Sequence, residues 1–378
     1  MNRMLNQLMW AVDLLLPCSI AVFLLPLDPR LSTLPIAVWL IVQLITADHS
    51  SKLLQWSWLA LLLFSVREWW FNNPPHPASI NDGVLLISAI VCASTVTPER
   101  WNRLIILPAI GFLPLLFTIS SKPWTPNPFV GANQAAYLFG LSFSMLSVWL
   151  FVSMRRSWEY LVVFFLASLA FISLWQTGSR AALISLFVSF SVSIAVYLLS
   201  KQSLWRTLGL MSLAAGFVYL LRAILSSNSS LPGLKAGSDL GRLLAYQCFA
   251  GLPFTGNNRL LYGAGFDRVA ELCQVEFQGL TLDHAHNLYL QIWAATGLLG
   301  FLGLGLLVCL ILQQYIAVQN QIPAQLRMCW LASFIYTLTQ GFFDVSLLHW
   351  PVALIYTGII LGLPYSFRDP RRIPSVIQ

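Results

Sequence analysis

Long apolar stretches recur along almost the whole chain, and they decide what it can fold into. A helix needs about 20 mostly apolar residues to cross the hydrocarbon core of a bilayer. The chain is 57% hydrophobic and 9% charged, whereas a soluble domain carries about 25% charged residues. This much apolar surface has to face lipid. The candidate spans are approximately 8–27, 31–47, 53–66, 79–97, 103–120, 131–152, 158–176, 179–199, 204–221, 285–317, 324–341 and 346–365.

We therefore predict an all-α, polytopic integral membrane protein with about 12 transmembrane helices, and we treat residues 1–378 as a single membrane domain. Placing the N-terminus in the cytoplasm puts twelve basic residues in inside segments and four in short outside segments. This distribution follows the positive-inside rule and predicts that both termini are cytoplasmic. The net charge of +7 then reports orientation. No basic run is long enough to indicate a nucleic-acid partner.

Residues 222–284 form the one long polar segment, and the topology makes it an outward-facing loop before the tenth helix. Cys248 and Cys273 lie within it and could pair in an oxidising compartment, but sequence does not show their geometry. The chain has no CxxC or HExxH spacing. We predict neither a metal site nor another cofactor.

The stretch LDHAHNLYLQ, residues 282–291, places an unusual polar cluster at the start of the helix expected over 285–317. Histidine titrates near neutral pH, so His286 is a candidate general base for a hydroxyl group, with Asp283 to orient it. The alternative is a capping and interface-anchoring cluster, in which Asp283 or Thr281 caps the helix. We expect His284 and His286 in the first helical turn, where residues two apart point in different directions, which argues against a zinc site.

Arg180 stands in TGSRAALISL, a very short outside turn where an arginine is unexpected. Gly178 and Ser179 predict a turn and a helix start, so Arg180 would lie in the first turn of the helix, where an anionic ligand is favoured. The alternative is an arginine that extends its charge to the membrane interface.

Two further arginines lie in the outward loop. Arg242 would lie in the first turns of a helix capped by Ser238 or Asp239, and its alternative role is a solvated partner of Asp239. Arg259 precedes a Gly-rich turn, which more readily bends the chain than binds phosphate.

Several other polar residues stand at outside turns. Asn133 begins a helix from the outside, with helix capping as its alternative role. We interpret Asp82, Asp344 and His349 as structural.

Three stretches together resemble the O-antigen ligase and O-antigen polymerase superfamily: GANQ at 131–134, TGSRAALISL, and HAHNLYLQIWAATGLLG. The resemblance covers roughly residues 120–365. It implies a GT-C-like membrane fold with a periplasmic loop, in the bacterial inner membrane. It also implies inverting, metal-independent transfer of a glycan from undecaprenyl diphosphate to an acceptor sugar, which is lipid A–core in ligases and another lipid-linked repeat in polymerases.

The resemblance also implies roles for individual residues. Arg180 and Arg242 would hold the diphosphate, and His286 would activate the acceptor hydroxyl, with His284 as the alternative base. The remaining candidates for contacts with diphosphate or glycan are Arg259, Asn287, His284 and Asn133. A rival of another class is a transporter of small anions such as bicarbonate. A transporter should place ionisable groups near mid-membrane, whereas here they gather at the outer rim.

Overall fold

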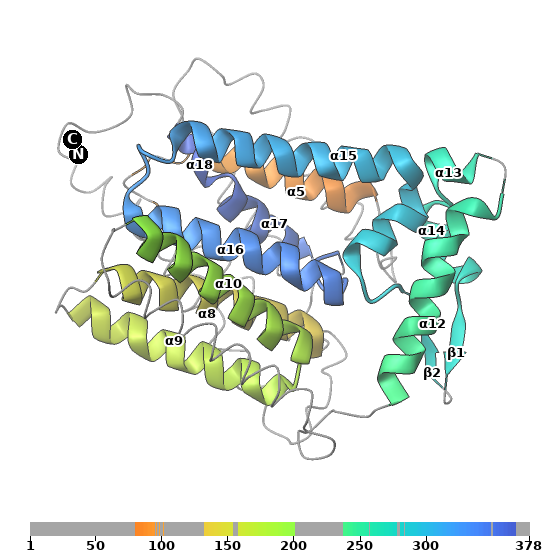
Figure 1. Cartoon of the computed structure of the whole chain (residues 1–378), viewed down its shortest axis with the longest axis horizontal. Helices are drawn as coiled ribbons and strands as arrows, with labels where there is room; N and C mark the ends of the chain where they lie inside the picture. The colour runs from red at the N-terminus through yellow and green to blue at the C-terminus, as the bar shows by residue number, and fades with distance from the viewer. Residues whose placement is uncertain are drawn as a thin grey trace, which may run out of the picture.

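A bundle of long helices with a smaller mixed subregion at one end makes up the computed structural model of the chain (Figure 1). Four helices form the main part of the bundle: α8 (Ala132–Ser153), α9 (Trp158–Thr177), α10 (Arg180–Ser200) and α16 (Ala324–Phe343). The structure describes residues 80–94, 96, 98, 101, 132–153, 158–200, 237–256, 258–277, 280–282, 284–348 and 351–367.

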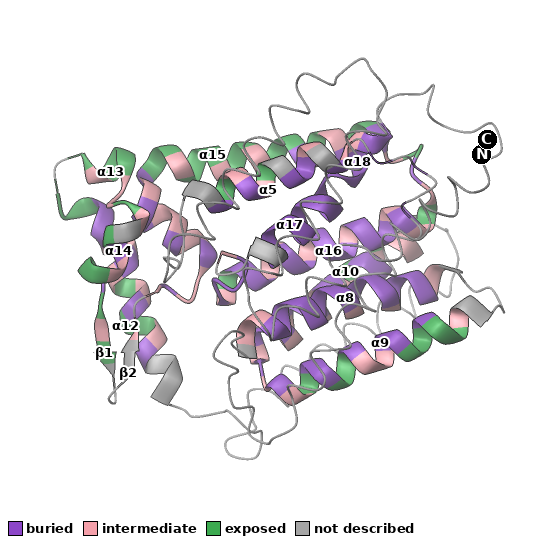
Figure 2. Ribbon diagram, turned by 180° about the vertical axis from the view of Figure 1, so that it is seen from behind, coloured by how far each residue is buried: buried purple, intermediate pink, exposed green. Residues whose placement is uncertain are grey.

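Helix α8 occupies the centre of this bundle. It packs against α9, α10 and α16, and α10 packs in turn against α16. The side chains of α8 are mostly buried, whereas α9 turns large apolar side chains outward (Figure 2). Leu161 and Phe165 of α9 are 69% and 60% exposed. A helix that is apolar on all sides and exposed on one suits contact with lipid.

Four helices among the described residues are long and apolar enough to cross a membrane: α8, α9, α10 and α15 (Leu288–Val318). They coincide with the spans predicted over 131–152, 158–176, 179–199 and 285–317, which confirms a multi-pass membrane protein. The spans predicted over 8–27, 31–47, 53–66, 103–120 and 204–221 lie outside the described residues.

The expected span over 346–365 is wrong as a single helix. The chain forms α17 (Pro351–Leu361) and then the short α18 (Leu363–Ser366). Pro364 has no N–H to continue the helical hydrogen bonding. Helix α17 packs closely on α5 (Ile80–Ala93): a Cβ added at Gly358 of α17 would lie 2.7 Å from the Leu86 carbonyl oxygen.

Buried polar contacts set how the bundle helices pair. The Tyr137 hydroxyl of α8 lies 3.1 Å from the Thr337 hydroxyl of α16. The Ser189 hydroxyl of α10 donates to the Ala332 carbonyl oxygen of α16 at 2.6 Å. Both helices run antiparallel to α16 (Figure 1). Their first turns therefore lie at the level where α16 ends, and this end of the bundle carries the candidate site.

The subregion at this end comes from the predicted outward loop. Its helices pack around a small core in which Phe249, Leu252 and Val269 meet Ala294 and Ala295 of α15. A two-stranded antiparallel hairpin, absent from the all-α prediction, pairs Glu276 with Thr281. The elements are α12 (Gly237–Gly251), η4 (Leu252–Phe254), α13 (Arg259–Tyr262), α14 (Phe266–Leu272), β1 (Val275–Phe277) and β2 (Leu280–Leu282).

A disulfide joins Cys248 of α12 to Cys273, which follows α14, so the pairing that the sequence left open is present.

Replacing both cysteines with serine should lower the free energy of unfolding of the subregion by about 3 kcal/mol, because the bond closes a loop of moderate length. Thermal unfolding of the protein in detergent, monitored by proteolysis of the loop, would measure this. Cys309→Ser, at an exposed thiol of α15, is the matched control. Equal melting of the double variant and the control would contradict the prediction.

Helix α15 bends at Gly297, where the backbone has φ 64° and ψ −158°. The turn after α13 packs into this bend: the Ala264 and Gly265 amides donate to the Ala294 and Ala295 carbonyl oxygens, both at 2.9 Å. Beyond the bend, residues 298–318 rise about 31 Å, enough to cross the hydrocarbon core. The bend thus separates the part of α15 that packs on the subregion from a full membrane span.

Gly297→Ala should destabilise the protein by more than about 2 kcal/mol. A left-handed conformation disfavours a side chain, and an added Cβ would lie 2.5 Å from the Gly263 backbone nitrogen. The thermal midpoint in detergent would report the loss. The matched control is Gly303→Ala in the same helix, where an added Cβ meets nothing within 4 Å. A midpoint as high as that of the control would show that the bend tolerates alanine.

Candidate active site

Helix α15 begins later than the sequence predicts. Its first residue is Leu288, and the Asn287 side-chain oxygen accepts a hydrogen bond from the Leu290 amide at 3.0 Å. Asn287 is therefore the N-cap, and the prediction of Asp283 or Thr281 in this role is wrong. The two histidines precede the helix instead of lying in its first turn.

The backbone of His286 is left-handed, with φ 48°, which is uncommon for a residue other than glycine. Neighbouring contacts hold it there: the Tyr246 hydroxyl donates to the His286 carbonyl oxygen at 3.3 Å. The side-chain nitrogen of Asn287 donates to the Phe342 carbonyl oxygen at 2.9 Å. The reversal brings the rings of His284 and His286 together, with centroids 4.0 Å apart. The expectation that these side chains point apart holds only for a helix and is wrong here.

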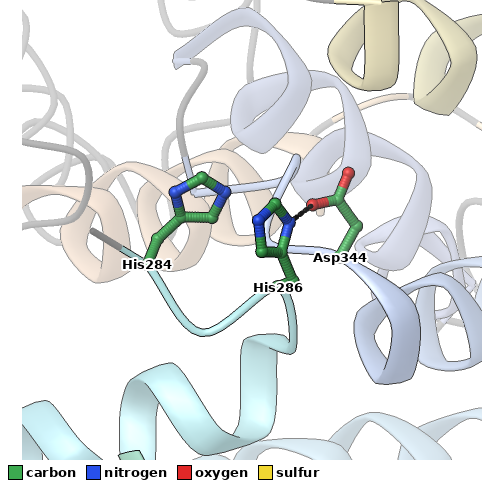
Figure 3. A group of neighbouring side chains, drawn as sticks. All are labelled: His284, His286 and Asp344. Carbon is green, nitrogen blue, oxygen red and sulfur yellow. Dashed lines mark ion pairs between the residues drawn. The ribbon is translucent and has the colours of Figure 1, made fainter. Parts of the chain in front are cut away.

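Asp344 faces the histidines from the end of α16 (Figure 3). Its Oδ1 lies 3.8 Å from the His286 Nδ1, and the carboxylate is almost fully buried. The Val345 amide donates to Oδ1 at 2.8 Å, and the Ser346 hydroxyl donates to Oδ2. From the sequence we interpret Asp344 as structural, because nothing local connects it to a histidine so far away along the chain.

Arg242 approaches His286 from α12. It lies one turn before Tyr246, so the two share a face of the helix, and Tyr246 bonds to the His286 backbone. The arginine is close enough for its charge to lower the pKa of His286. The structure therefore brings together two residues that the sequence singled out separately. Because α12 begins at Gly237, Ser238 and Asp239 lie inside its first turn instead of preceding it.

Burial is the main reason why the pKa of His286 lies below its ordinary value, and the charges of His284 and Arg242 add to the effect against the opposing pull of Asp344. Burial acts to raise the pKa of Asp344, but its interaction with His286 and the hydrogen bond from Ser346 hold it below its ordinary value. The pair at neutral pH is thus a neutral imidazole beside a carboxylate.

Arg180 is the first residue of α10, as predicted. Gly178 has φ 68°, and the Ser179 hydroxyl accepts from the Ala182 amide at 3.4 Å, so this turn and its cap are confirmed. The antiparallel pairing with α16 places Arg180 at the end of the bundle where Asp344 lies, and Asn133 in the first turn of α8 shares that end.

Arg259 lies away from the two histidines. Its guanidinium donates to the Thr255 hydroxyl at 3.1 Å within its own turn, and α13 packs at the bend of α15. The histidines lie at the other end of that helix segment, before Leu288.

Two buried glutamines complete the surroundings. Gln291 and Gln340 are each 2% exposed. The Gln291 oxygen accepts from the Ala285 amide at 2.9 Å, and the Asp344 amide donates to the Gln340 carbonyl oxygen at 3.0 Å. Among the described residues, the Gln291 side-chain nitrogen and both side-chain polar atoms of Gln340 have no hydrogen-bond partner. Buried polar atoms are normally paired, so the site has spare donors and acceptors for a polar ligand. Gln340 is not predictable from the sequence, where it is one polar position in an apolar helix.

Residues 165–305 match the model of a protein family described as O-antigen ligase. The matched segment holds α10, the described part of the loop subregion and the first half of α15, and therefore Arg180, Arg242 and His286. The match covers less than half of the chain and agrees with the resemblance that the sequence motifs indicate. No curated protein matches the chain. Proteins of this family are membrane glycosyltransferase-like ligases and polymerases. Asp344 lies beyond the matched segment.

Proposed function

We propose that the protein is an O-antigen ligase-type glycosyltransferase. It would transfer a glycan from undecaprenyl diphosphate to a sugar of lipid A–core at the periplasmic face of the inner membrane, without a metal. The observation that carries this proposal is the pairing of His286 with Asp344 beside Arg242. These residues lie at one end of a membrane bundle, and residues 165–305 of the chain match the O-antigen ligase family model.

His286 would be the general base. Its Nδ1 faces Asp344, so the carboxylate favours the tautomer with the proton on Nδ1 and leaves the Nε2 lone pair for the acceptor hydroxyl. The distance of 3.8 Å exceeds a hydrogen bond, and such contacts commonly tighten when substrate binds. Nε2 takes the hydroxyl proton while the oxygen bonds to the anomeric carbon. The bond from that carbon to the diphosphate oxygen breaks on the opposite face, which inverts the centre.

The leaving diphosphate carries several negative charges, and arginines would stabilise it. Arg180 stands at the N-terminus of α10, where the helix dipole and free amides also favour an anion. Arg242 lies on the face of α12 that approaches His286. Guanidinium groups bind phosphate oxygens through two parallel hydrogen bonds, and their effect grows as the glycosidic bond breaks.

Two observations support the periplasmic side. Disulfides persist in oxidising compartments, and the subregion beside the site contains one between Cys248 and Cys273. The distribution of basic residues independently predicts that the loop faces outward. Cysteine labelling at position 180 from the cytosolic side would contradict this orientation.

The remaining predicted contacts differ in their surroundings. Asn133 and His284 lie at the site end of the bundle and are the better candidates for glycan hydroxyls. Asn287 uses both ends of its amide within the chain, so we assign it first to shaping the histidine loop. Arg259 would reach only a part of the glycan that extends along the subregion.

The direct test is transfer by purified protein from lipid-linked glycan to acceptor in the presence of a chelator. We expect product without added metal, and a requirement for Mg²⁺ would contradict the mechanism.

The surface glycan made after deletion of the gene distinguishes a ligase from a polymerase. Carrier-linked polymer without attachment indicates a ligase, and a single attached repeat indicates a polymerase. Liposome uptake of bicarbonate that survives Arg180→Ala would favour a transporter.

Asp344→Asn should lower kcat about 100-fold or more, because an amide no longer fixes the imidazole tautomer. KM for the lipid-linked donor should change little, since Asp344 would act through His286. Initial rates at varied donor concentration would measure both constants. Ser346→Ala removes one hydrogen bond to the same carboxylate and should cost much less. An Asp344→Asn loss confined to KM would contradict the positioning role.

A further inference from the structure

The two histidines and Asp344 form a cluster with the composition of a metal site. Each offers one ligand atom, and the three atoms lie within 4.8 Å of one another. They come from two segments that the tertiary structure brings together, the loop before α15 and the end of α16 (Figure 3). Imidazole nitrogens with one carboxylate oxygen are ligands typical of zinc.

The distance between His286 and Asp344 fits a shared metal ion better than a direct hydrogen bond. The His286 Nδ1 lies 3.8 Å from the Asp344 Oδ1, beyond the 2.7–3.2 Å of an N–H···O bond. This nitrogen is buried and has no hydrogen-bond partner among the described residues. Ligand atoms about 2.1 Å from a tetrahedral zinc ion are about 3.4 Å apart. A shift of a few tenths of an ångström would let both atoms hold one ion.

We propose that His284, His286 and Asp344 bind one zinc-like transition-metal ion reversibly, and that this ion inhibits the enzyme. Neutral imidazole favours Zn²⁺ and Co²⁺, whereas Mg²⁺ prefers all-oxygen sites. His284 is partly exposed, so its ring can turn toward the ion. A water molecule can occupy the fourth position.

The inhibition follows from the chemistry of the imidazole ring and rests on the proposed function. A neutral ring has one proton and one free lone pair. When a metal ion takes the Nδ1 lone pair, the proton moves to Nε2. Nε2 then has no lone pair to accept the proton of the acceptor hydroxyl. Metal binding and general-base catalysis are therefore mutually exclusive at His286.

Charge near the cluster keeps the binding moderate. The ligands bring one negative charge, from Asp344, and Arg242 is near enough to act on His286 electrostatically. Its positive charge opposes a divalent cation. A bound diphosphate would offset that charge, so occupancy should respond to the donor lipid.

Binding is tested on the purified full chain in detergent, washed with chelator and titrated with Co²⁺. We expect visible absorption bands of a low-symmetry site that saturate at one ion per chain and disappear when Zn²⁺ is added. His284→Ala should weaken the affinity at least tenfold, and His284→Gln should do the same if the alanine variant folds poorly. Glu271→Gln, which removes an exposed carboxylate of α14 outside the cluster, should bind like the natural sequence. Absence of the bands, or undiminished affinity in both His284 variants, would overturn the site.

Inhibition is tested in the transfer assay, each variant being compared with its own rate in chelator. We expect Zn²⁺ to inhibit, chelator to restore the rate, and His284→Ala to need at least ten times more Zn²⁺ for half inhibition. A bound ion that leaves the rate unchanged or raises it would overturn the inhibitory role. Absence of transfer under every condition would count against the proposed function, and the cobalt titration alone would then decide the metal site.

Discussion

Replacing His286 with asparagine should lower kcat for glycan transfer by about 10²–10⁴-fold, the usual contribution of a general base. Asparagine is the informative substitution because His286 has a left-handed backbone, which asparagine tolerates better than most residues. The variant therefore keeps the loop and removes the imidazole. Single-turnover transfer from lipid-linked glycan to acceptor would measure the chemical step directly.

His286→Ala should lower the thermal midpoint more than His286→Asn does. The two variants should lose about the same amount of turnover. This comparison separates the chemistry of the side chain from the strain of the backbone. Normal turnover by His286→Asn would show that the base is elsewhere, and the same measurement on His284→Asn would then be decisive. Both variants should retain the Cys248–Cys273 disulfide, which serves as a check of the fold.

Arg180→Ala and Arg242→Ala should each lower the rate by about 10²–10³-fold, or about 3–4 kcal/mol of transition-state stabilisation. The charge on the leaving diphosphate develops as the bond to the anomeric carbon breaks, so the effect should fall mainly on kcat. Lysine at either position should recover part of the loss, because it restores the charge without the paired hydrogen bonds of a guanidinium.

Arg268→Ala is the matched control, since Arg268 is exposed on α14 and has no assigned role in the site. Its rate of glycan transfer should stay within a factor of a few of the rate of the natural sequence. If Arg180→Ala and Arg242→Ala behaved like Arg268→Ala, the diphosphate charge would have to be neutralised by other groups. Full activity of the lysine variants would show that charge alone suffices at these positions.

The membrane helices were predictable because lipid imposes a simple rule. A segment that spans the bilayer has to satisfy its backbone hydrogen bonds internally and be apolar over a set length. The predicted spans over 158–176 and 179–199 therefore fall within a residue of α9 and α10. The start of α10 was predictable too, because a glycine turn and a serine cap act over a few residues.

The beginning of α15 shows where local signals fail. Thr281, Asp283 and Asn287 are all residue types that cap helices, and propensity does not choose among them. The choice falls on Asn287 because its amide also bonds to Phe342, at the end of α16. That contact depends on how α15 and α16 pack, and with it the histidines leave the helix.

The sequence by itself determined a multi-pass helical membrane protein and marked Arg180, Arg242 and His286 as the residues to watch. Hydropathy and capping act locally, so they can be read along the chain. The tertiary structure alone decided that Asp344 faces His286, that the two histidine rings lie together and that Gly297 bends α15. Each of these depends on contacts between segments distant in sequence, whose geometry is set when the helices pack.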